Sequence, residues 1–538
     1  MNAEYSEPQK IIARRQMIES AISTLTEGRT NATLCRRSYV REVRDRLVDR
    51  GGYDAEAGGQ LTDETINRWE AFYDSVSQVR DAKSLKVAYL CGPNPENDLR
   101  EFCAAGILPE NIWAFESDVK VYTKAVISAL SSEFPFVKIV KSGIDTFIDA
   151  SPVRFYIIYL DFCGPLPSRN AKQKTLLAIS RVLARHALNS PGALITNVSL
   201  PTESGDARGR ALIAKLVACY LYPKDFIESE EGTTPEGPIA QGYDFSEWLN
   251  IVESELDEYY GQFITRLLMD HAGFISPYNR FPKQSSVFSN FFKKMTGDES
   301  KALVAAAFHF SESEEFGGGD VIVDAGEYPI LWTFAALNKK INAQDCNYPQ
   351  WVNLDPEFAK FADQFLSQLR TDGDKEALIN NTCELTFSML AEQNGGAFLA
   401  PNLAEMVNSH RFQDYYLFCD LVLSHQIVEL LFRQVAIPYH VNVETTRRWR
   451  YQAKETPMFM DMTILDECRY IYDWMPTADM ISAGFSNIER QLAYRFALDG
   501  VSKHRRWYNS EYFSGTAVID QFTQPFEAKI LRPRTNIE

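Results

Sequence analysis

Residues 86–118 read KVAYLCGPNPENDLREFCAAGILPENIWAFESD, and their pattern decides the fold class. Val87–Cys91 is an apolar run typical of a parallel strand covered on both faces, and Gly92 ends it. The residues that follow repeat apolar side chains at helical spacing. Ile112–Phe115 predicts a second strand, which leads directly to the acidic residue Glu116. A buried strand, a tight turn, a helix and a second strand that ends at an acid form the opening half of a nucleotide-binding α/β domain.

Strands and helices continue to alternate after this segment. Helical spacing predicts helices over 119–130 and 174–187, and apolar runs predict strands over 137–140, 155–160 and 192–198. The alternation predicts an α/β fold with a doubly wound, mostly parallel Rossmann-like sheet and helices on both faces. Ligands of such sheets bind beyond the carboxyl ends of the strands. Polar or small residues follow four of the predicted strands at that edge: Gly92, Glu116, Asp145 and Asp161.

With these residues in place, the chain resembles the class I S-adenosylmethionine-dependent methyltransferases over residues 85 to 200. In that superfamily a glycine-rich loop follows the first strand, an acid ends the second, and an Asp or Asn motif follows the fourth. The resemblance implies S-adenosylmethionine as cofactor. It implies that the cofactor is held by residues after the first three strands, namely Gly92, Pro93, Asn94, Glu116, Ser117, Gly143 and Asp145. It also implies that Asp161, Phe162 and Cys163 line the place where methyl donor and acceptor meet.

The first loop departs from the superfamily pattern. Residues 92–98 read GPNPEND, so one glycine remains of Gly-x-Gly-x-Gly, and two prolines remove backbone N–H donors. Because a bound pyrophosphate needs such donors at the start of a helix, a dinucleotide oxidoreductase is disfavoured. A sulfonium cofactor is positively charged and has no phosphate, so Glu96 and Asp98 are compatible with it. The same loop is also compatible with lost cofactor binding, which leaves a catalytically degenerate scaffold or binding subunit of a larger complex as the alternative function.

The residues after the fourth predicted strand bear on the chemistry. Methyl transfer needs an aligned acceptor lone pair, which Asp161 can orient and Phe162 can support by stacking. Cys163 is a candidate nucleophile for cytosine C5 methylation, but no Pro precedes it, and a cysteine after a buried strand is more often a packing residue. Methylation of a nitrogen atom is therefore favoured. A turn or capping role for Asp161, and a role for Glu116 as a solvated acid before the next helix, stay open.

Length and composition frame the rest of the chain. The 538 residues predict a helical N-terminal extension (1–80), a Rossmann-like methyltransferase domain (81–335) with an insertion near 203–255, and a mostly helical C-terminal domain (340–538) with an extended segment near 437–464. Nine cysteines without a CxxC pair, and a start without a signal-peptide core, predict a cytoplasmic protein. Charged residues interrupt the longest apolar stretch, so we expect no membrane span, and the histidine spacing predicts no metal site.

The net charge of −17 disfavours nonspecific DNA binding, but basic residues cluster beside aromatic ones near the end of the chain. Such clusters suit stacking on bases and pairing with phosphates, so they predict RNA or DNA as the methyl acceptor, bound through the C-terminal domain. Pairing of these cations with acids elsewhere in the chain is the alternative, and a protein partner in a larger complex is a further expectation. The candidate binding residues are Arg447, Arg448, Trp449, Arg450, Lys454, Arg505 and Arg506.

Overall fold

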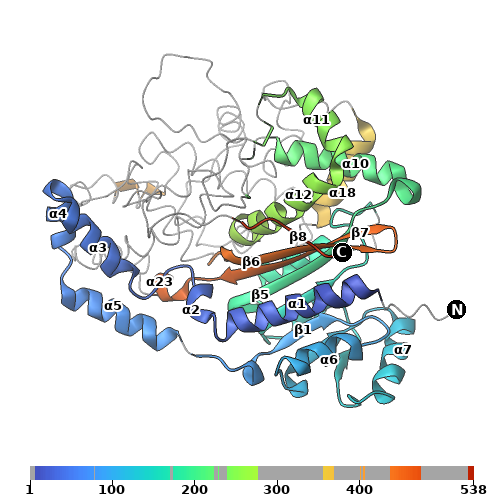
Figure 1. Ribbon diagram of the computed structural model, residues 1–538, viewed down its shortest axis with the longest axis horizontal. Coiled ribbons are helices and arrows are strands. Elements are labelled where there is room, and N and C mark those ends of the chain that lie inside the picture. The colour runs from blue at the N-terminus through green and yellow to red at the C-terminus, as the bar shows by residue number, and fades with distance from the viewer. Residues whose placement is uncertain are drawn as a thin grey trace.

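The computed structural model describes a layered α/β protein (Figure 1). It describes residues 7–77, 79–169, 174–222, 224, 228, 239–240, 242–276, 355–368, 400–401, 404–405, 437–473 and 531–538. Within these residues one sheet of eight strands runs in the order β3-β2-β1-β4-β5-β7-β6-β8. The strands are β1 (Val87–Leu90), β2 (Ile112–Phe115), β3 (Lys138–Val140), β4 (Phe155–Asp161), β5 (Leu188–Ser199), β6 (His440–Ala453), β7 (Thr456–Asp466) and β8 (Thr535–Asn536).

The first five strands are parallel to one another, as the sequence predicts. β7 pairs antiparallel with β5, and β6 pairs antiparallel with β7, so β6 runs in the same direction as β1 to β5. β8 adds a short parallel strand to the outer side of β6. The predicted mostly parallel sheet is therefore confirmed, with one reversed strand between β5 and β6.

Helices cover both faces of this sheet. Successive side chains of a strand point to opposite faces, and apolar side chains on both faces are buried by these helices. Val87 and Tyr89 of β1 pack with α1, α6 and α7, whereas Ala88 packs into the core formed with the helices of the other face. The first layer holds α1 (Pro8–Leu25), α6 (Glu96–Ala104) and α7 (Val119–Leu130). The second holds α8 (Ile144–Ala150), α9 (Thr175–Ala184), α10 (Glu203–Leu221), α11 (Phe245–Ser254), α12 (Leu256–Asp270) and α18 (Pro356–Gln368).

Two domain expectations need correction. The extended segment expected near 437–464 exists, but its strands β6 and β7 complete the central sheet, so a boundary near 340 does not separate them from the Rossmann-like domain. The segment expected as an insertion near 203–255 contains α10 and α11, whose apolar faces pack into the second helical layer. The first correction arises because strands that pair with a partner distant in sequence leave no local pattern of that pairing. Residues 303–310 and 320–323, whose apolar runs also predict strands of the sheet, lie outside the described residues.

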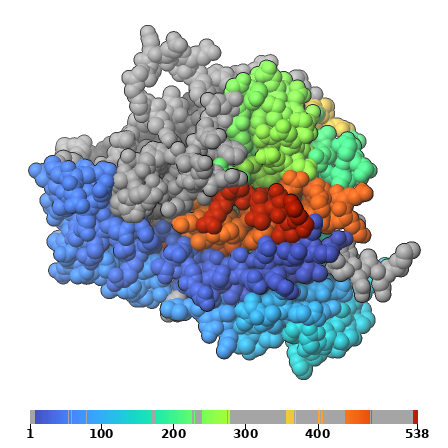
Figure 2. Space-filling model, viewed as in Figure 1, coloured from blue at the N-terminus to red at the C-terminus, as the bar shows by residue number. Residues whose placement is uncertain are grey.

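Residues 7–77 are mostly helical, and the first helix of this segment packs against the central sheet. In Figure 2, α1 crosses the visible face directly beside the chain end that carries β8. The other helices are α2 (Arg29–Ala32), α3 (Tyr39–Arg50), α4 (Gly52–Gly59) and α5 (Asp63–Val76), and α23 (Arg469–Tyr472) follows β7.

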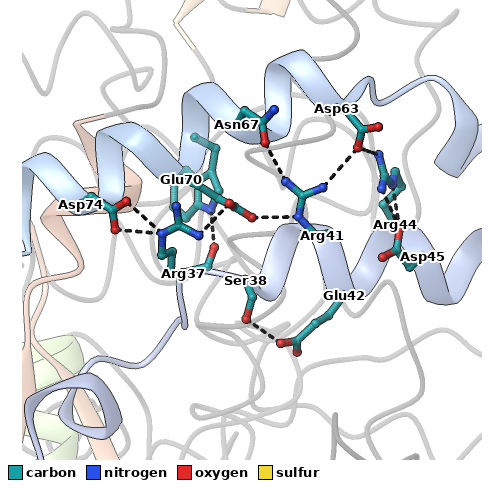
Figure 3. Close-up of polar contacts among 11 residues, drawn as sticks. Arg37, Ser38, Arg41, Glu42, Arg44, Asp45, Asp63, Asn67, Glu70 and Asp74 are labelled. Carbon is teal, nitrogen blue, oxygen red and sulfur yellow. Dashed lines mark hydrogen bonds and ion pairs between the residues drawn. The ribbon is translucent and has the colours of Figure 1, made fainter.

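Ion pairs hold α3 and its preceding turn against α5 (Figure 3). Arg37 bonds Asp74 at 2.8 Å, and its other guanidinium nitrogen bonds Glu70 at 2.7 Å. Arg41 also donates to Glu70, at 3.0 Å. Arg37 and Arg41, just before and at the start of α3, are therefore paired with acidic residues of α5.

Candidate functional site

The loop after β1 lies at the carboxyl edge of the sheet and starts with a left-handed residue. Gly92 has φ of +57°, a conformation that glycine adopts without strain, and nothing lies within 4 Å of the place a Cβ would occupy. The Tyr89 hydroxyl donates to the Pro95 carbonyl at 2.7 Å and so fixes the far end of the loop. Between them, Pro93 is exposed and Asn94 is half-buried. The backbone of the loop is therefore accessible at Gly92, and a hydrogen bond to β1 fixes its far end at Pro95.

Glu116 follows β2 next to this loop and is half-buried. Its Oε1 accepts a hydrogen bond from the Asp118 backbone N–H at 2.8 Å. Asp118, not Glu116, caps α7, because its carboxylate accepts from the N–H groups of Lys120 and Val121. The second carboxylate oxygen of Glu116 has no partner among the described residues and can bind a hydroxyl group. Ser117 beside it is exposed.

The residues expected after β3 lie at the start of α8. Gly143 is the N-cap residue of this helix, and Asp145 lies in its first turn. The Asp145 carboxylate folds back so closely over Gly143 that a side chain at this position would collide with it. Part of the role of both residues is therefore local, although Asp145 remains half-exposed at the carboxyl edge.

Asp161 ends β4 and is held by two neighbours from distant parts of the chain. Lys10 of α1 forms an ion pair with its Oδ2 at 2.7 Å, and Asn197 of β5 donates to its Oδ1 at 2.7 Å. Burial alone would raise the pKa of Asp161, but the Lys10 ammonium and these hydrogen bonds outweigh it and keep the pKa below its usual value. Asp161 is thus a fixed carboxylate bound to a cation, not a turn residue.

A second ion pair lies beside the first. Arg14, one helical turn after Lys10, contacts Asp98 of α6 at 2.6 Å, and both residues are buried. Burial raises the pKa of Asp98 to about 6, although Arg14 acts in the opposite direction. Pro95 occupies the N-cap position of α6, so Asp98 faces α1 and does not cap the helix. The two pairs fasten α1 across the carboxyl ends of β1 and β4.

Asn197 connects this cluster to the outer strands. Its side-chain amide nitrogen also donates to the hydroxyl of Tyr451 in β6 at 2.8 Å. The residue is fully buried, and its Oδ1 has no hydrogen-bond partner among the described residues. An unpaired buried carbonyl is costly, and this oxygen is therefore available to accept a further hydrogen bond.

The two residues after Asp161 are placed differently from each other. Phe162 is half-buried and packs against the core under the second helical layer, so only part of its ring is available for stacking. Cys163 is exposed by surface area, but surrounding protein still desolvates its thiol. That desolvation, with the Asp161 carboxylate nearby, raises the pKa of Cys163 and so disfavours the thiolate that a nucleophile requires.

The charge balance of the site is negative. Lys10 and Arg14 neutralise Asp161 and Asp98, which leaves the carboxylates that flank the first loop. These are Glu116 and Glu96, whose Oε1 accepts from Ser128 at 2.8 Å. In the part of the chain that the structure describes, no group of three or more His, Cys, Asp or Glu residues could hold a metal ion. The arrangement suits a small cationic ligand better than an anionic one.

The first basic and aromatic cluster does not form one exposed surface. Arg448 and Trp449 are buried, and Arg448 forms an ion pair with Glu228. The Trp449 indole N–H donates to Gln16 of α1 at 3.0 Å. A ring that stacks on bases must be accessible, so this tryptophan is a packing residue.

The other members of that cluster are mostly engaged within the chain. Arg450 is paired with Asp257 at 2.7 Å, and Arg447 donates to the backbone carbonyls of Glu444 and Thr446. Lys454 is exposed in the turn between β6 and β7. The alternative that these cations pair with acids of the same chain is therefore correct for Arg448 and Arg450. The second cluster, with Arg505 and Arg506, lies outside the described residues.

Sequence reasoning missed four residues of the site: Lys10, Arg14, Asn197 and Tyr451. Two signals could have found most of them. Lys10 and Arg14 are spaced four apart on the same stripe of α1 as the buried Met17, so charges interrupt an apolar helix face. Asn197 stands inside an otherwise apolar strand, where a polar side chain needs a partner. Tyr451 left no such signal, because it lies 254 residues from Asn197.

No helix within the described residues is long and apolar enough to cross a membrane. Comparison with known proteins found no matching family model, no matching curated protein and no matching solved structure.

Proposed function

We propose that this chain is an S-adenosylmethionine-dependent methyltransferase. One observation carries the proposal: an antiparallel β7 stands between β5 and β6 in the order β3-β2-β1-β4-β5-β7-β6. Class I methyltransferases have a reversed strand at this place, whereas the dinucleotide-binding order continues with a parallel strand beside β5. The strand order and the proline-containing first loop therefore argue against a dinucleotide enzyme independently of each other.

The residues at the carboxyl edge fit this cofactor. Gly92 leaves open space where a side chain would otherwise block close approach of a ligand to the backbone. The half-buried Glu116 has a carboxylate oxygen that can accept a hydrogen bond from a ribose hydroxyl. Asp145 follows the next strand. The excess of carboxylates over cations favours a positively charged ligand. When bound, the cofactor supplies a methyl group on a sulfonium sulfur.

The chain's own residues would position the acceptor. Asp161 is a carboxylate at neutral pH, because Lys10 and Asn197 stabilise its charge. It can orient a nitrogen acceptor by accepting a hydrogen bond, and it can take a proton only if Lys10 moves away. The exposed part of Phe162 lies directly after it. Positioning of this kind supplies much of the rate in transfer reactions. A nucleic-acid acceptor remains a prediction, which now rests on Lys454, Arg505 and Arg506.

The Lys10–Asp161 pair also favours a second candidate function. Lys10 and Asn197 between them engage both carboxylate oxygens of Asp161, and α1 is also fixed there by the Arg14–Asp98 pair. A chain in which these pairs never open would be a catalytically degenerate scaffold that retains the methyltransferase fold.

Calorimetric titration with S-adenosylmethionine and with its demethylated product tests the proposal and separates the two candidates. We expect the wild type to bind and the dissociation constant to rise by about 10- to 100-fold in Glu116→Ala. This factor corresponds to the free energy that a hydrogen bond to a charged group contributes. Glu110→Ala is the matched control, because Glu110 is an exposed acid before the opposite end of the same strand. No binding by folded wild type would refute cofactor use and leave the scaffold, and equal binding by Glu116→Ala would refute the assigned site.

A further inference from the structure

Helix α7 exposes large apolar residues along its outer face. The fully buried residues of its inner side are small, Ala125 and Ala129, and the larger Val121, Tyr122 and Val126 beside them are half-buried. Its outer face carries Val119, Ile127 and Leu130, whose exposed fractions are 57%, 61% and 64%. An ordinary surface helix buries its large apolar residues and exposes polar ones.

This apolar face is also concentrated in one place. Among the described residues, exposed large hydrophobic side chains elsewhere are scattered over α1, α3, α5 and single loop positions. Phe136, which is 92% exposed, follows the helix in the connection to β3. Exposed apolar residues gathered on one helix face are typical of an interaction site. Figure 1 places α7 at the margin of the molecule, outside α6.

We propose that this face binds the same face of a second copy of the chain, with the two α7 helices antiparallel about a two-fold axis. A two-fold contact requires that the patch be complementary to itself. The charges of α7 meet this requirement, because its exposed lysines Lys120 and Lys124 lie in the first half and Glu133 lies just past the end. The lysines also suit the negative carboxyl end of the partner's helix dipole.

The antiparallel register follows from the spacing. With Val126 and Ile127 at the axis, Val126 of one copy lies opposite the partner subunit's Ile127. Lys120 then lies opposite the partner subunit's Glu133, and each such pair occurs twice. Glu133 already bonds Arg100 of its own chain at 2.8 Å, and both side chains are about half exposed. The carboxylate has a second oxygen for the partner's lysine.

The neighbouring edge strand does not provide an alternative contact. β3 is an edge of the sheet, but it has only three residues and carries Lys138, both of which discourage pairing with another strand. Lys138 is also held over the Trp113 ring at 3.9 Å. Recognition therefore falls to the helix face. One helix face is small compared with the roughly 800 Å² per partner of a standard interface, so we expect a dimer that dissociates on dilution.

Sedimentation velocity over a dilution series of the full chain tests this inference, whatever the outcome for cofactor binding. We expect a monomer–dimer equilibrium in the wild type and a dissociation constant at least about tenfold higher in Ile127→Glu and Leu130→Glu. Val48→Glu, at a similarly exposed apolar residue of α3, is the matched control and should dimerise like the wild type. Equal melting temperatures would show that the variants are folded.

A charge reversal tests the register. Lys120→Glu and Glu133→Lys should each weaken the dimer, and the double variant should restore it, because the opposite charges then face each other again. A wild type that stays monomeric at its highest soluble concentration would overturn the proposal. A dimer that Ile127→Glu leaves unchanged would also overturn it. Failure of the double variant to recover would overturn the antiparallel register.

Discussion

Replacing Lys10 by Met tests whether α1 is fastened to the sheet through Asp161. The change keeps the length of the side chain and removes the ammonium that lies 2.7 Å from the Asp161 carboxylate. Asp161 would then be a buried charge with Asn197 as its remaining hydrogen-bond donor. We expect the free energy of unfolding at pH 7 to fall, and the carboxyl group to take up a proton more readily than in the wild type.

The expected magnitude follows from the burial of the pair. Removing one partner of a fully buried pair costs about 3–5 kcal/mol. Here the side chains retain 13% and 11% exposure, and Asn197 still satisfies one oxygen, so we expect about 2–3 kcal/mol. Lys10 lowers the folded-state pKa of Asp161, so the stabilisation is present above the unfolded pKa and is lost as the pH falls through the folded pKa. Wild type and variant should therefore converge in acid.

Urea unfolding of Lys10→Met, Asp161→Asn and the double variant measures the coupling directly. We expect a coupling energy of about 1–3 kcal/mol, since the residues are in contact. Arg15→Met is the control, because Arg15 lies on the exposed side of the same helix and its ion pair with Glu101 at 3.1 Å should contribute much less to stability than the Lys10–Asp161 pair. A Lys10→Met protein with wild-type stability, together with additive effects in the double variant, would refute the reasoning.

Three further changes probe the fold away from the site. Burial lowers the pKa of His271 to about 4 from 6.5, so about 3 kcal/mol of stability should be lost as the pH falls from 6.5 to 4, and pH-dependent urea unfolding should show this slope flattened in His271→Phe. Burial would raise the pKa of Glu467, but hydrogen bonds from His186 and Arg154 outweigh it and lower the pKa from 4.5 to about 2. Glu467→Gln should therefore lose about 2–3 kcal/mol above pH 4.5, and the difference should vanish towards pH 2. Glu70→Gln, which weakens the contacts of α5 with α3, should cost about 1 kcal/mol in thermal unfolding at low salt and less at high salt.

Individual helices and strands could be predicted, because each depends on a short periodic pattern of apolar residues in the sequence. The helix expected over 119–130 and the strand expected over 112–115 match α7 and β2 residue for residue. The last strands were not predictable as part of the sheet. β5 and β7 pair between Gly192 and Leu465, and such pairing depends on the other strand, not on a local pattern.

The candidate site divides in the same way. Glu116 and Asp161 were found, because they end apolar strands at the edge where such folds bind ligands. Lys10 was not found, because α1 reaches the site from a segment 151 residues before Asp161 in the sequence. The basic residues around Trp449 were recognised as a cluster, but their spacing could not reveal that acids of the same chain would enclose them.

The late arrival of β7 has a consequence for synthesis of the chain. β5 ends at Ser199 and β7 ends at Asp466, so 267 residues must be translated before the exposed side of β5 can be paired. At about 5–20 residues per second, this takes roughly 13–53 seconds. During that time the nascent chain presents one of its longest and most apolar strands as an open edge, which is a template for association with other chains. Ribosome-bound chains that stop before residue 440 should therefore recruit chaperones, whereas chains extended past residue 466 should release them.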